Sequence, residues 1–268
     1  MDRDLHGLRM IITGASSGIG RCLAEQAAQQ GSRLILAARS TAILAELADT
    51  LKGKGAEVIP VTTDVTKEAD RHQLLQIAQE QFGGLDVLIN NAGVASFGHF
   101  ATSSEEILRQ IMEVNFFAPA ELIREAIPVL VRGKKPAIVS ISSMCGRRGL
   151  PAWTEYSASK FALCGLTEAL RGEMARFDID VLLVVPGLTQ SDLPRHLLRN
   201  DGQMKIDFQG GMPPHDVAAT VLQALRRNRT ETVLGREARW MLRVNRFFPR
   251  LVDRLIAGRV HKLYKISL

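Results

Sequence analysis

Seven apolar runs of strand length recur along this 268-residue chain, and longer stretches with helical periodicity separate them. Near-continuous Val, Ile and Leu is typical of strands that are buried on both faces of a parallel sheet. Strands that alternate with helices indicate right-handed crossovers, so the sequence predicts an α/β fold with a doubly wound sheet of about seven parallel strands. The runs are LRMIIT, RLILAA, AEVIPV, LDVLIN, AIVSIS, DVLLVV and ETVLG, which begin near residues 8, 33, 56, 85, 137, 180 and 231.

Composition narrows the class of protein further. With 46% hydrophobic and 23% charged residues, the chain lacks the signatures of disordered, collagen-like and disulfide-scaffold proteins. Three cysteines, no CxxC motif and scattered histidines predict neither a disulfide framework nor a metal site, and indicate a reducing compartment. The charged N-terminus lacks the apolar region of a secretory signal. We therefore expect a cytoplasmic protein that binds no metal.

A glycine-rich turn follows the first predicted strand. Residues 13–20 read TGASSGIG and lead directly into a helical pattern. Glycine lets a backbone turn sharply and approach a pyrophosphate, and the N–H groups at a helix N-terminus attract its charge. A turn in this place predicts a dinucleotide-binding site in a Rossmann-type fold, with an ordinary glycine turn as the alternative.

Arg39 follows the second predicted strand, about 20 residues after the glycine turn. An acidic residue in this place would bind the ribose 2′-hydroxyl of NAD, whereas a guanidinium can pair with a 2′-phosphate. We therefore expect NADP(H) as the cofactor. In the alternative interpretation Arg39 only begins a solvated helix.

Two further motifs accompany the glycine turn: NNAG at residues 90–93 and YSASK at residues 156–160. With TGxxxGxG, they make the chain resemble the single-domain branch of the short-chain dehydrogenase/reductase (SDR) family over roughly residues 8–235. The resemblance implies an oxidoreductase that transfers a hydride between a nicotinamide and a small-molecule carbonyl or secondary alcohol. The cofactor-binding positions that it implies are Gly14, Ser16, Ser17, Gly18, Ile19, Gly20, Arg39, Asp64, Val65, Asn91, Ala92, Gly93, Tyr156, Lys160, Pro186, Gly187 and Ser191.

Four residues are predicted to be catalytic: Ser143, Tyr156, Lys160 and Asn115. Tyr156 and Lys160 are four residues apart in a helical pattern, so they share one face. The phenol of Tyr156, with an ordinary pKa of about 10, becomes a usable acid or base when the Lys160 ammonium and an oxidised nicotinamide stabilise its phenolate. The family further implies that Lys160 binds the nicotinamide ribose and that Asn115 holds a water of a proton relay.

Three serines, Ser140, Ser142 and Ser143, lie together at the end of the fifth predicted strand. Neighbouring residues of a strand point to opposite faces, so Ser142 and Ser143 should not share one role. The family's separation of thirteen residues between serine and tyrosine selects Ser143, which would bind the substrate oxygen. We expect Ser142 to have a structural role.

The substrate side of the site is predicted in outline only. The long segment 189–211 is expected to form a lid, with Cys145 and Trp153 near the pocket. The alternative function is a non-catalytic NADPH-binding regulatory or scaffold protein on the same fold. The four intact catalytic residues argue against that alternative.

The last part of the chain is strongly basic. Twelve Lys and Arg residues and three acids lie between Arg226 and Lys265, a local charge of +9, whereas residues 1–225 carry 22 basic and 25 acidic residues. We expect residues 1–235 to form a single dinucleotide-binding catalytic domain and residues 236–268 a basic helical extension. Because the positive charge is confined to one end and no nucleic-acid module is recognisable, we expect no nucleic-acid partner.

Apolar residues and arginines recur at helical spacing in this extension, and Pro249 is expected to kink or divide the helix. Three roles are open. Residues 236–264 could make a peripheral contact with an anionic membrane, join a partner subunit, or cover their own domain. We also expect a homodimer or homotetramer.

Overall fold

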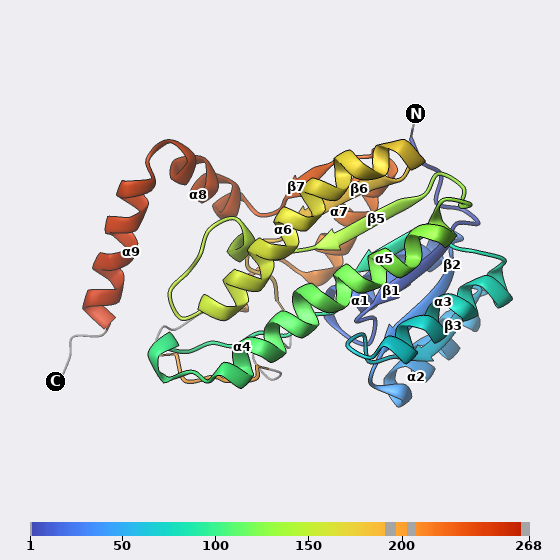
Figure 1. Ribbon diagram of the computed structural model, residues 1–268, viewed down its shortest axis with the longest axis horizontal. Helices are drawn as coiled ribbons and strands as arrows, with labels where there is room; N and C mark the ends of the chain where they lie inside the picture. Colours follow the sequence, from blue (N-terminus) through green and yellow to red (C-terminus); the bar gives the residue numbers. More distant parts are fainter. Residues whose placement is uncertain (1, 191–196, 203–206, 264–268) are drawn as a thin grey trace.

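The computed structural model describes residues 2–190, 197–202 and 207–263. A seven-stranded parallel sheet with the order β3-β2-β1-β4-β5-β6-β7 forms its centre (Figure 1). The predicted Rossmann-type fold and its seven parallel strands are confirmed. The strands are β1 (Arg9–Thr13), β2 (Arg33–Ala38), β3 (Val58–Thr62), β4 (Val87–Asn90), β5 (Ala137–Ile141), β6 (Asp180–Val185) and β7 (Glu231–Val233).

Helices cover both faces of the sheet. α1, α2 and α7 pack on one face, and α3, α5 and α6 pack on the other. In Figure 1, α5 and α6 lie in front of the sheet. The helices are α1 (Gly18–Gln29), α2 (Thr41–Lys52), α3 (Glu68–Phe82), α4 (Glu105–Met112), α5 (Ala118–Leu130), α6 (Thr154–Met174), α7 (Pro214–Arg226), α8 (Arg236–Phe247) and α9 (Pro249–Leu263).

The two cores explain why the strands are continuously apolar. Ile12 and Leu36 are buried with residues of α1 and α7, whereas their neighbours Ile11 and Ile35 are buried with residues of α3 and α5. Side chains alternate between the faces of a strand, so a sheet that is covered on both sides needs an apolar residue at every position. The absence of polar alternation in the sequence follows from this double cover.

The carboxyl ends of all seven strands meet at one edge of the sheet, because every pairing is parallel. The strand order reverses between β1 and β4, and in open α/β sheets ligands bind outside the carboxyl ends at such a point. The segments that follow β1, β4, β5 and β6 carry most of the predicted site residues. These predicted site residues therefore lie together at the carboxyl edge of the sheet.

The C-terminal extension is helical and divided. α8 ends at Phe247 and α9 begins at Pro249, as the proline predicted. Both helices project beyond the layers of the sheet, at the left of Figure 1. Ala238 of α8 and Val252 of α9 are buried, so each helix has one side against other parts of the chain.

A buried ion pair joins β1 and β4 at the opposite, amino edge of the sheet. The Asp86 carboxylate accepts hydrogen bonds from Nε and Nη2 of Arg9, at 2.9 and 2.6 Å, and from the backbone N–H groups of Arg9 and Lys134, at 2.9 and 2.6 Å. Burial raises the pKa of Asp86, but these hydrogen bonds and the Arg9 charge outweigh that effect and hold the pKa below its usual range.

We expect Asp86→Asn to lower the free energy of unfolding by about 3 kcal/mol, because it leaves the partly buried Arg9 without its counter-charge. The depressed pKa contributes stability above the unfolded-state value of about 4, and this contribution is lost as the pH falls through the folded-state pKa. Urea unfolding between pH 7 and pH 3 measures both effects. Glu57→Gln is the control, since it breaks the exposed pair with Arg33 and should cost under about 1 kcal/mol. Equal losses in the two variants would contradict the assignment.

Candidate active site

The glycine turn after β1 leads into α1. Two of its positions, Gly14 and Gly20, have no room for a side chain. Gly14 has a φ of +66°, in the left-handed region that favours glycine. A Cβ atom on Gly20 would lie 2.1 Å from the carbonyl oxygen of Gly14. The first N–H groups of a helix have no intrahelical partner, and the Ser17 side chain does not cap those of α1. The turn therefore offers N–H groups and a positive helix end to an anion.

The turn is fixed to the NNAG segment that follows β4. The Asn91 side-chain amide donates to the carbonyl oxygens of Thr13 (2.9 Å) and Gly14 (3.2 Å). In return, the Thr13 hydroxyl accepts the backbone N–H groups of Asn91 and Ala92, both at 3.0 Å. A Cβ atom on Gly14 would lie 2.9 Å from Cα of Ala92, so the two backbones are in close contact. The hydroxyl and the amide together hold both segments at the switch point of the sheet.

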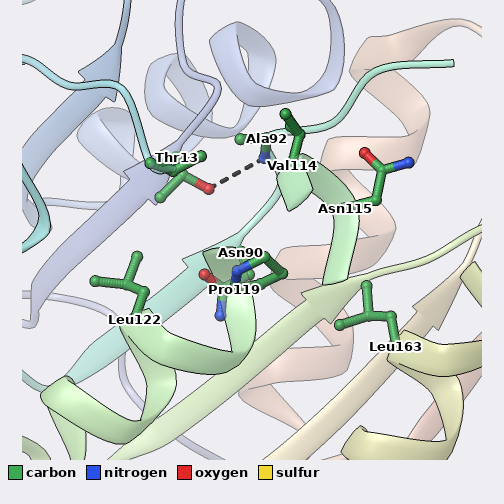
Figure 2. Close-up of a pocket in the computed structure, with 9 residues that line it drawn as sticks. Thr13, Asn90, Ala92, Val114, Asn115, Pro119, Leu122 and Leu163 are labelled. Carbon is green, nitrogen blue, oxygen red and sulfur yellow. Dashed lines mark hydrogen bonds between the residues drawn. The ribbon is translucent and has the colours of Figure 1, made fainter. Parts of the chain in front are cut away.

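A small cavity lies beneath this junction (Figure 2). Its volume of about 10 Å³ has room for about one water molecule and excludes a dinucleotide. The Asn90 side-chain nitrogen is buried without a hydrogen-bond partner in the described part of the chain. The residues that line the cavity are Thr13, Val65, Asn90, Ala92, Val114, Asn115, Pro119, Leu122 and Leu163.

Three predicted cofactor residues follow β2 and β3. Arg39 is exposed directly after β2 and has no acidic partner among the residues that the structure describes. The Asp64 carboxylate accepts the backbone N–H (3.2 Å) and hydroxyl (2.8 Å) of Thr66, so it shapes the turn after β3. Val65 lines the cavity beneath the NNAG segment. All three lie at the carboxyl edge of the sheet.

Tyr156 and Lys160 stand on α6 beside the end of β5. The Lys160 ammonium donates to the carbonyl oxygen of Ile141 at 3.1 Å and lies 5.8 Å from the centre of the Tyr156 ring. Burial lowers the pKa of Lys160 to about 8. Burial also raises the pKa of the Tyr156 hydroxyl, and the nearby Ser143 hydroxyl opposes that rise. At pH 7 the lysine is therefore charged and the tyrosine keeps its proton.

The structure separates the neighbouring serines. Ser143 begins the turn after β5 and accepts the backbone N–H of Cys145 at 3.2 Å, and its hydroxyl lies close enough to Tyr156 to oppose the rise that burial causes in the pKa of that phenol. The Ser142 hydroxyl is buried instead against the carbonyl oxygen of Lys160 and the sulfur of Cys164, both at 3.2 Å. Of the two, Ser143 is the serine that lies beside the tyrosine.

Asn115 lies in a π-helical turn (Glu113–Phe117) between α4 and α5, and it is 1% exposed. Its side chain donates to the carbonyl oxygen of Val94 (2.8 Å) and the hydroxyl of Ser159 (2.9 Å), and accepts the N–H of Val94 (2.9 Å). A Cβ atom on Gly93 would lie 3.2 Å from Oδ1 of Asn115 and 3.5 Å from Nζ of Lys160. The asparagine and the lysine therefore border the same glycine.

An apolar wall surrounds the tyrosine. The Trp153 ring lies 5.0 Å from that of Phe97, 5.7 Å from that of Tyr156 and 6.4 Å from that of Phe208, and Cys145 is buried in the same cluster. Sequence reasoning placed Trp153 and Cys145 near the pocket but missed both phenylalanines. The position of Phe97, four residues after the NNAG motif, was the available signal for that residue. No local pattern points to Phe208.

The segment after β6 closes the site from the other side. The Pro186 carbonyl accepts the backbone N–H of Met144 at 2.7 Å, and the Gly187 N–H donates to the carbonyl oxygen of Leu234 at 3.0 Å. Ser191 and much of the predicted lid lie outside the described residues. The described residues 197–202 pair with the segment after β4 through the backbone of Phe97, which fixes one end of that region.

Comparisons with known proteins agree with this arrangement. A family model described as short chain dehydrogenase matches residues 9–201. The chain is 34% identical over 251 residues to an uncharacterized oxidoreductase, YxnA, of Bacillus subtilis, a match that covers 92% of this chain and 70% of the relative. The chain belongs to the short-chain dehydrogenase/reductase family and is an oxidoreductase of that family.

Solved structures share the fold over most of the chain. An SDR protein from Burkholderia phymatum in complex with NAD superimposes with a TM-score of 0.84 at 29% identity, over 93% of this chain and 96% of that one. An alcohol dehydrogenase from the archaeon Thermococcus sibiricus, complexed with 5-hydroxy-NADP, gives a TM-score of 0.76 at 26% identity, over 85% and 96%. These two proteins carry different cofactors, so the choice between them rests on this chain's own residues.

Two kinds of feature are absent from the described residues. No helix in residues 2–190, 197–202 and 207–263 is long and apolar enough to cross a membrane. Within the same ranges, no group of three or more His, Cys, Asp or Glu side chains is arranged to hold a metal ion.

We expect Gly20→Ala to disrupt the glycine turn. The new methyl group would meet the Gly14 backbone at 2.1 Å, so the variant should lose about 1–3 kcal/mol of unfolding free energy and bind a dinucleotide at least tenfold more weakly. Urea unfolding and a fluorescence titration with NADPH measure the two losses. Gly172→Ala in α6 is the matched control, because a Cβ atom there meets nothing within 4 Å and a helical alanine stabilises. Unchanged stability and affinity in Gly20→Ala would contradict the close packing.

Proposed function

We propose that residues 1–235 form an NADP(H)-dependent catalytic domain that transfers a hydride between a nicotinamide and a carbonyl or secondary alcohol. One observation carries the proposal. The hydroxyls of Ser143 and Tyr156 and the ammonium of Lys160 lie together at the carboxyl edge of the sheet. The glycine turn lies at the same edge.

The residues at this edge fit a nicotinamide dinucleotide. The turn at Gly14 and Gly20 has backbone where a side chain would otherwise stand, and the uncapped N-terminus of α1 offers N–H groups to a pyrophosphate. Gly93 puts bare backbone beside Asn115 and Lys160, and Lys160 would hold the nicotinamide ribose, as the family resemblance implies. We propose that the other predicted positions from β3, β4 and β6 complete this site.

The protein's own groups would manage the proton. A bound nicotinamide would supply the hydride. Tyr156, which carries its proton at pH 7, would donate it to the substrate oxygen while Ser143 holds that oxygen by a hydrogen bond. The Lys160 ammonium, which is charged below a pKa of about 8, would stabilise the phenolate that forms. These protonation states favour reduction of a carbonyl.

The preference for NADP(H) rests on Arg39. Its guanidinium is exposed at the end of β2 and pairs with no acid in the described part of the chain, so it is available to a 2′-phosphate. An acidic residue in the same place would repel that phosphate.

The apolar wall favours an apolar substrate. Trp153, Phe97 and Phe208 face the tyrosine side of the site, with Leu150 and Leu197 against the same cluster. A charged substrate would lose its hydration against these side chains without compensation. We therefore propose a ketone or aldehyde with a substantial apolar body.

We also propose a homodimer or homotetramer. Phe117, just before α5, and Phe161 on α6 are 48% and 45% exposed. Large exposed apolar side chains on neighbouring helices support an interface between copies of the chain.

A cytoplasmic location is consistent with three free cysteines, and burial raises the pKa of Cys145 to about 11, which keeps this thiol unreactive.

We expect Tyr156→Phe to lower kcat by about 10²–10⁴-fold, because it removes the proton donor and keeps the ring in the apolar wall. Ser143→Ala should have a similar effect on kcat. NADPH oxidation at 340 nm, measured on whichever members of a panel of apolar ketones and aldehydes the wild type reduces, provides the rates.

Ser142→Ala is the matched control for the serine. Its hydroxyl contacts Lys160 and Cys164 rather than the tyrosine, so the variant should lose stability and keep most of its kcat. A larger loss of kcat in Ser142→Ala than in Ser143→Ala would mean that the wrong serine is assigned. NADPH binding without turnover of any carbonyl by the wild type would favour the regulatory alternative.

We expect the wild type to bind NADPH more tightly than NADH, and Arg39→Ala to reduce the NADPH affinity by about 10- to 100-fold. A charge-assisted hydrogen bond to the 2′-phosphate contributes roughly 1.5–3 kcal/mol, whereas NADH lacks that phosphate and should be little affected. Titration calorimetry with both cofactors measures the difference. Arg132→Ala, which removes an exposed arginine after α5, should change neither affinity. Equal affinities of the wild type for NADH and NADPH would defeat the preference.

A further inference from the structure

The outward side of α8 combines arginines with large aromatic side chains. Arg236, Trp240, Arg243 and Phe247 are spaced at i, i+4, i+7 and i+11, so they form one stripe along the helix. All four are exposed, Trp240 to 67% and Phe247 to 71%. Arg239 is exposed as well and stands one residue before the tryptophan. This stripe joins positive charge and apolar area on one surface.

The exposed surface continues onto α9. Phe248, at the corner between the helices, is 62% exposed, and Leu251 and Leu255 follow at 48% and 58%. Arg254 and Lys262 are exposed on the same helix. Monomeric proteins rarely leave this many large apolar side chains open together unless something binds them. We call the exposed basic and large apolar side chains of the two helices, with Phe248 between them, the outer face; these are Arg236, Arg239, Trp240, Arg243, Arg246, Phe247, Phe248, Arg250, Leu251, Arg254, Leu255, Arg259 and Lys262.

The opposite sides of both helices are attached to the rest of the molecule. Arg148, in the turn after β5, hydrogen-bonds Asn245 of α8 at 3.0 Å and forms an ion pair with Asp253 of α9. Ala238 is buried beside Gly187, and Val252 is buried on α9. Because the inner sides already make these contacts, the helices do not need the outer face to cover their own domain.

The outer face is also strongly positive. Between Arg236 and Leu263 the chain carries eight basic residues and two acids, and one of those acids, Asp253, is already paired with Arg148. The exposed aliphatic side chains Leu251 and Leu255 gain nothing from a purely ionic partner. The fitting partner is negatively charged at its surface and apolar just beneath it.

We propose that the outer face of α8 and α9 binds an anionic lipid surface. Arginines near such a surface are attracted to its headgroups, and tryptophan and phenylalanine side chains settle at the boundary between headgroups and acyl chains. A second copy of the chain fits less well, because a twofold interface brings identical patches together and would place the arginines of one outer face against those of the other.

This contact would lie beside the active site. Arg148 is five residues after Ser143, and Ala238 touches the glycine that follows Pro186. The segments that hold α8 and α9 are therefore the turn that carries Ser143 and the Pro186–Gly187 segment, which is bonded to that turn through Met144. An apolar substrate that is dissolved in the lipid would have a short path to the apolar wall. This statement about the substrate rests on the proposed function, whereas the proposal of lipid binding does not.

The test is co-sedimentation of the full-length protein with phosphatidylcholine vesicles that contain or lack phosphatidylserine. We expect binding to the anionic vesicles that weakens at least tenfold when NaCl rises from about 0.1 M to about 1 M, where the Debye length falls from about 10 Å to about 3 Å. Each arginine near the surface contributes about a fivefold factor, so the triple variant Arg239→Gln, Arg243→Gln, Arg246→Gln should bind on the order of 100-fold more weakly.

A control variant removes the same three charges elsewhere. Lys52→Gln, Lys54→Gln, Arg132→Gln changes exposed residues of the catalytic domain and should bind vesicles within about twofold of the wild type. Far-ultraviolet circular dichroism and an NADPH titration establish that each variant is folded. Equal losses in the two triple variants would show a general charge effect and overturn the proposal.

Tryptophan fluorescence gives a second readout that is independent of activity. The chain has two tryptophans, and of these Trp153 is buried whereas Trp240 is exposed. Anionic vesicles should shift the emission of the wild type to shorter wavelength, and Trp240→Phe should abolish the shift. The proposal would be overturned by an unchanged spectrum or by equal binding to neutral and anionic vesicles. It would also be overturned if the wild type bound no vesicles and the Arg239→Gln, Arg243→Gln, Arg246→Gln variant differed from it in oligomeric mass by light scattering.

Discussion

The hydrogen bonds between Thr13 and the Asn91–Ala92 segment fix the two loops that meet at the switch point of the sheet. On one side of that junction lies the glycine turn, and on the other lies Gly93, which borders both Asn115 and Lys160. An error of about 1 Å between a cofactor site and an acid/base group can reduce a rate about 100-fold. The strands β1 and β4 already pair in the sheet, and one hydroxyl and one amide extend that common register to the segments that follow them.

Stability and chemistry are divided between opposite edges of the sheet. At the amino edge, Asp86 and Arg9 satisfy each other with several hydrogen bonds. At the carboxyl edge, the structure keeps features that stabilise nothing by themselves, such as a buried lysine with a lowered pKa and an uncapped helix end. Functional sites commonly retain such costs. The ion pair at the amino edge stabilises the fold, whereas the groups at the carboxyl edge serve the site.

Local patterns in the sequence account for the strands and for the pair on α6. An apolar run reports a doubly covered strand, and a four-residue spacing reports one helix face, since both depend on near neighbours only. Such local patterns could not predict most of the apolar wall, because Phe97, Trp153 and Phe208 come from three segments that are distant in the sequence. Strand alternation predicted different roles for Ser142 and Ser143, and a family spacing selected Ser143; the structure gives the contacts of each hydroxyl.

The π-helical turn around Asn115 changes the phase of the helix that contains it. An extra residue in one turn rotates all later residues of the helix by roughly 100° relative to an unbroken α-helix. α5 directs Leu122 and Ile123 into the sheet core, while α4, only a few residues earlier, packs against α6. A one-residue deletion in this turn would rotate Asn115 relative to the core-facing side of α5 and so break its hydrogen bonds with Val94 and Ser159. The position of Asn115 in the site thus depends on the number of residues in this helix as well as on its side chains.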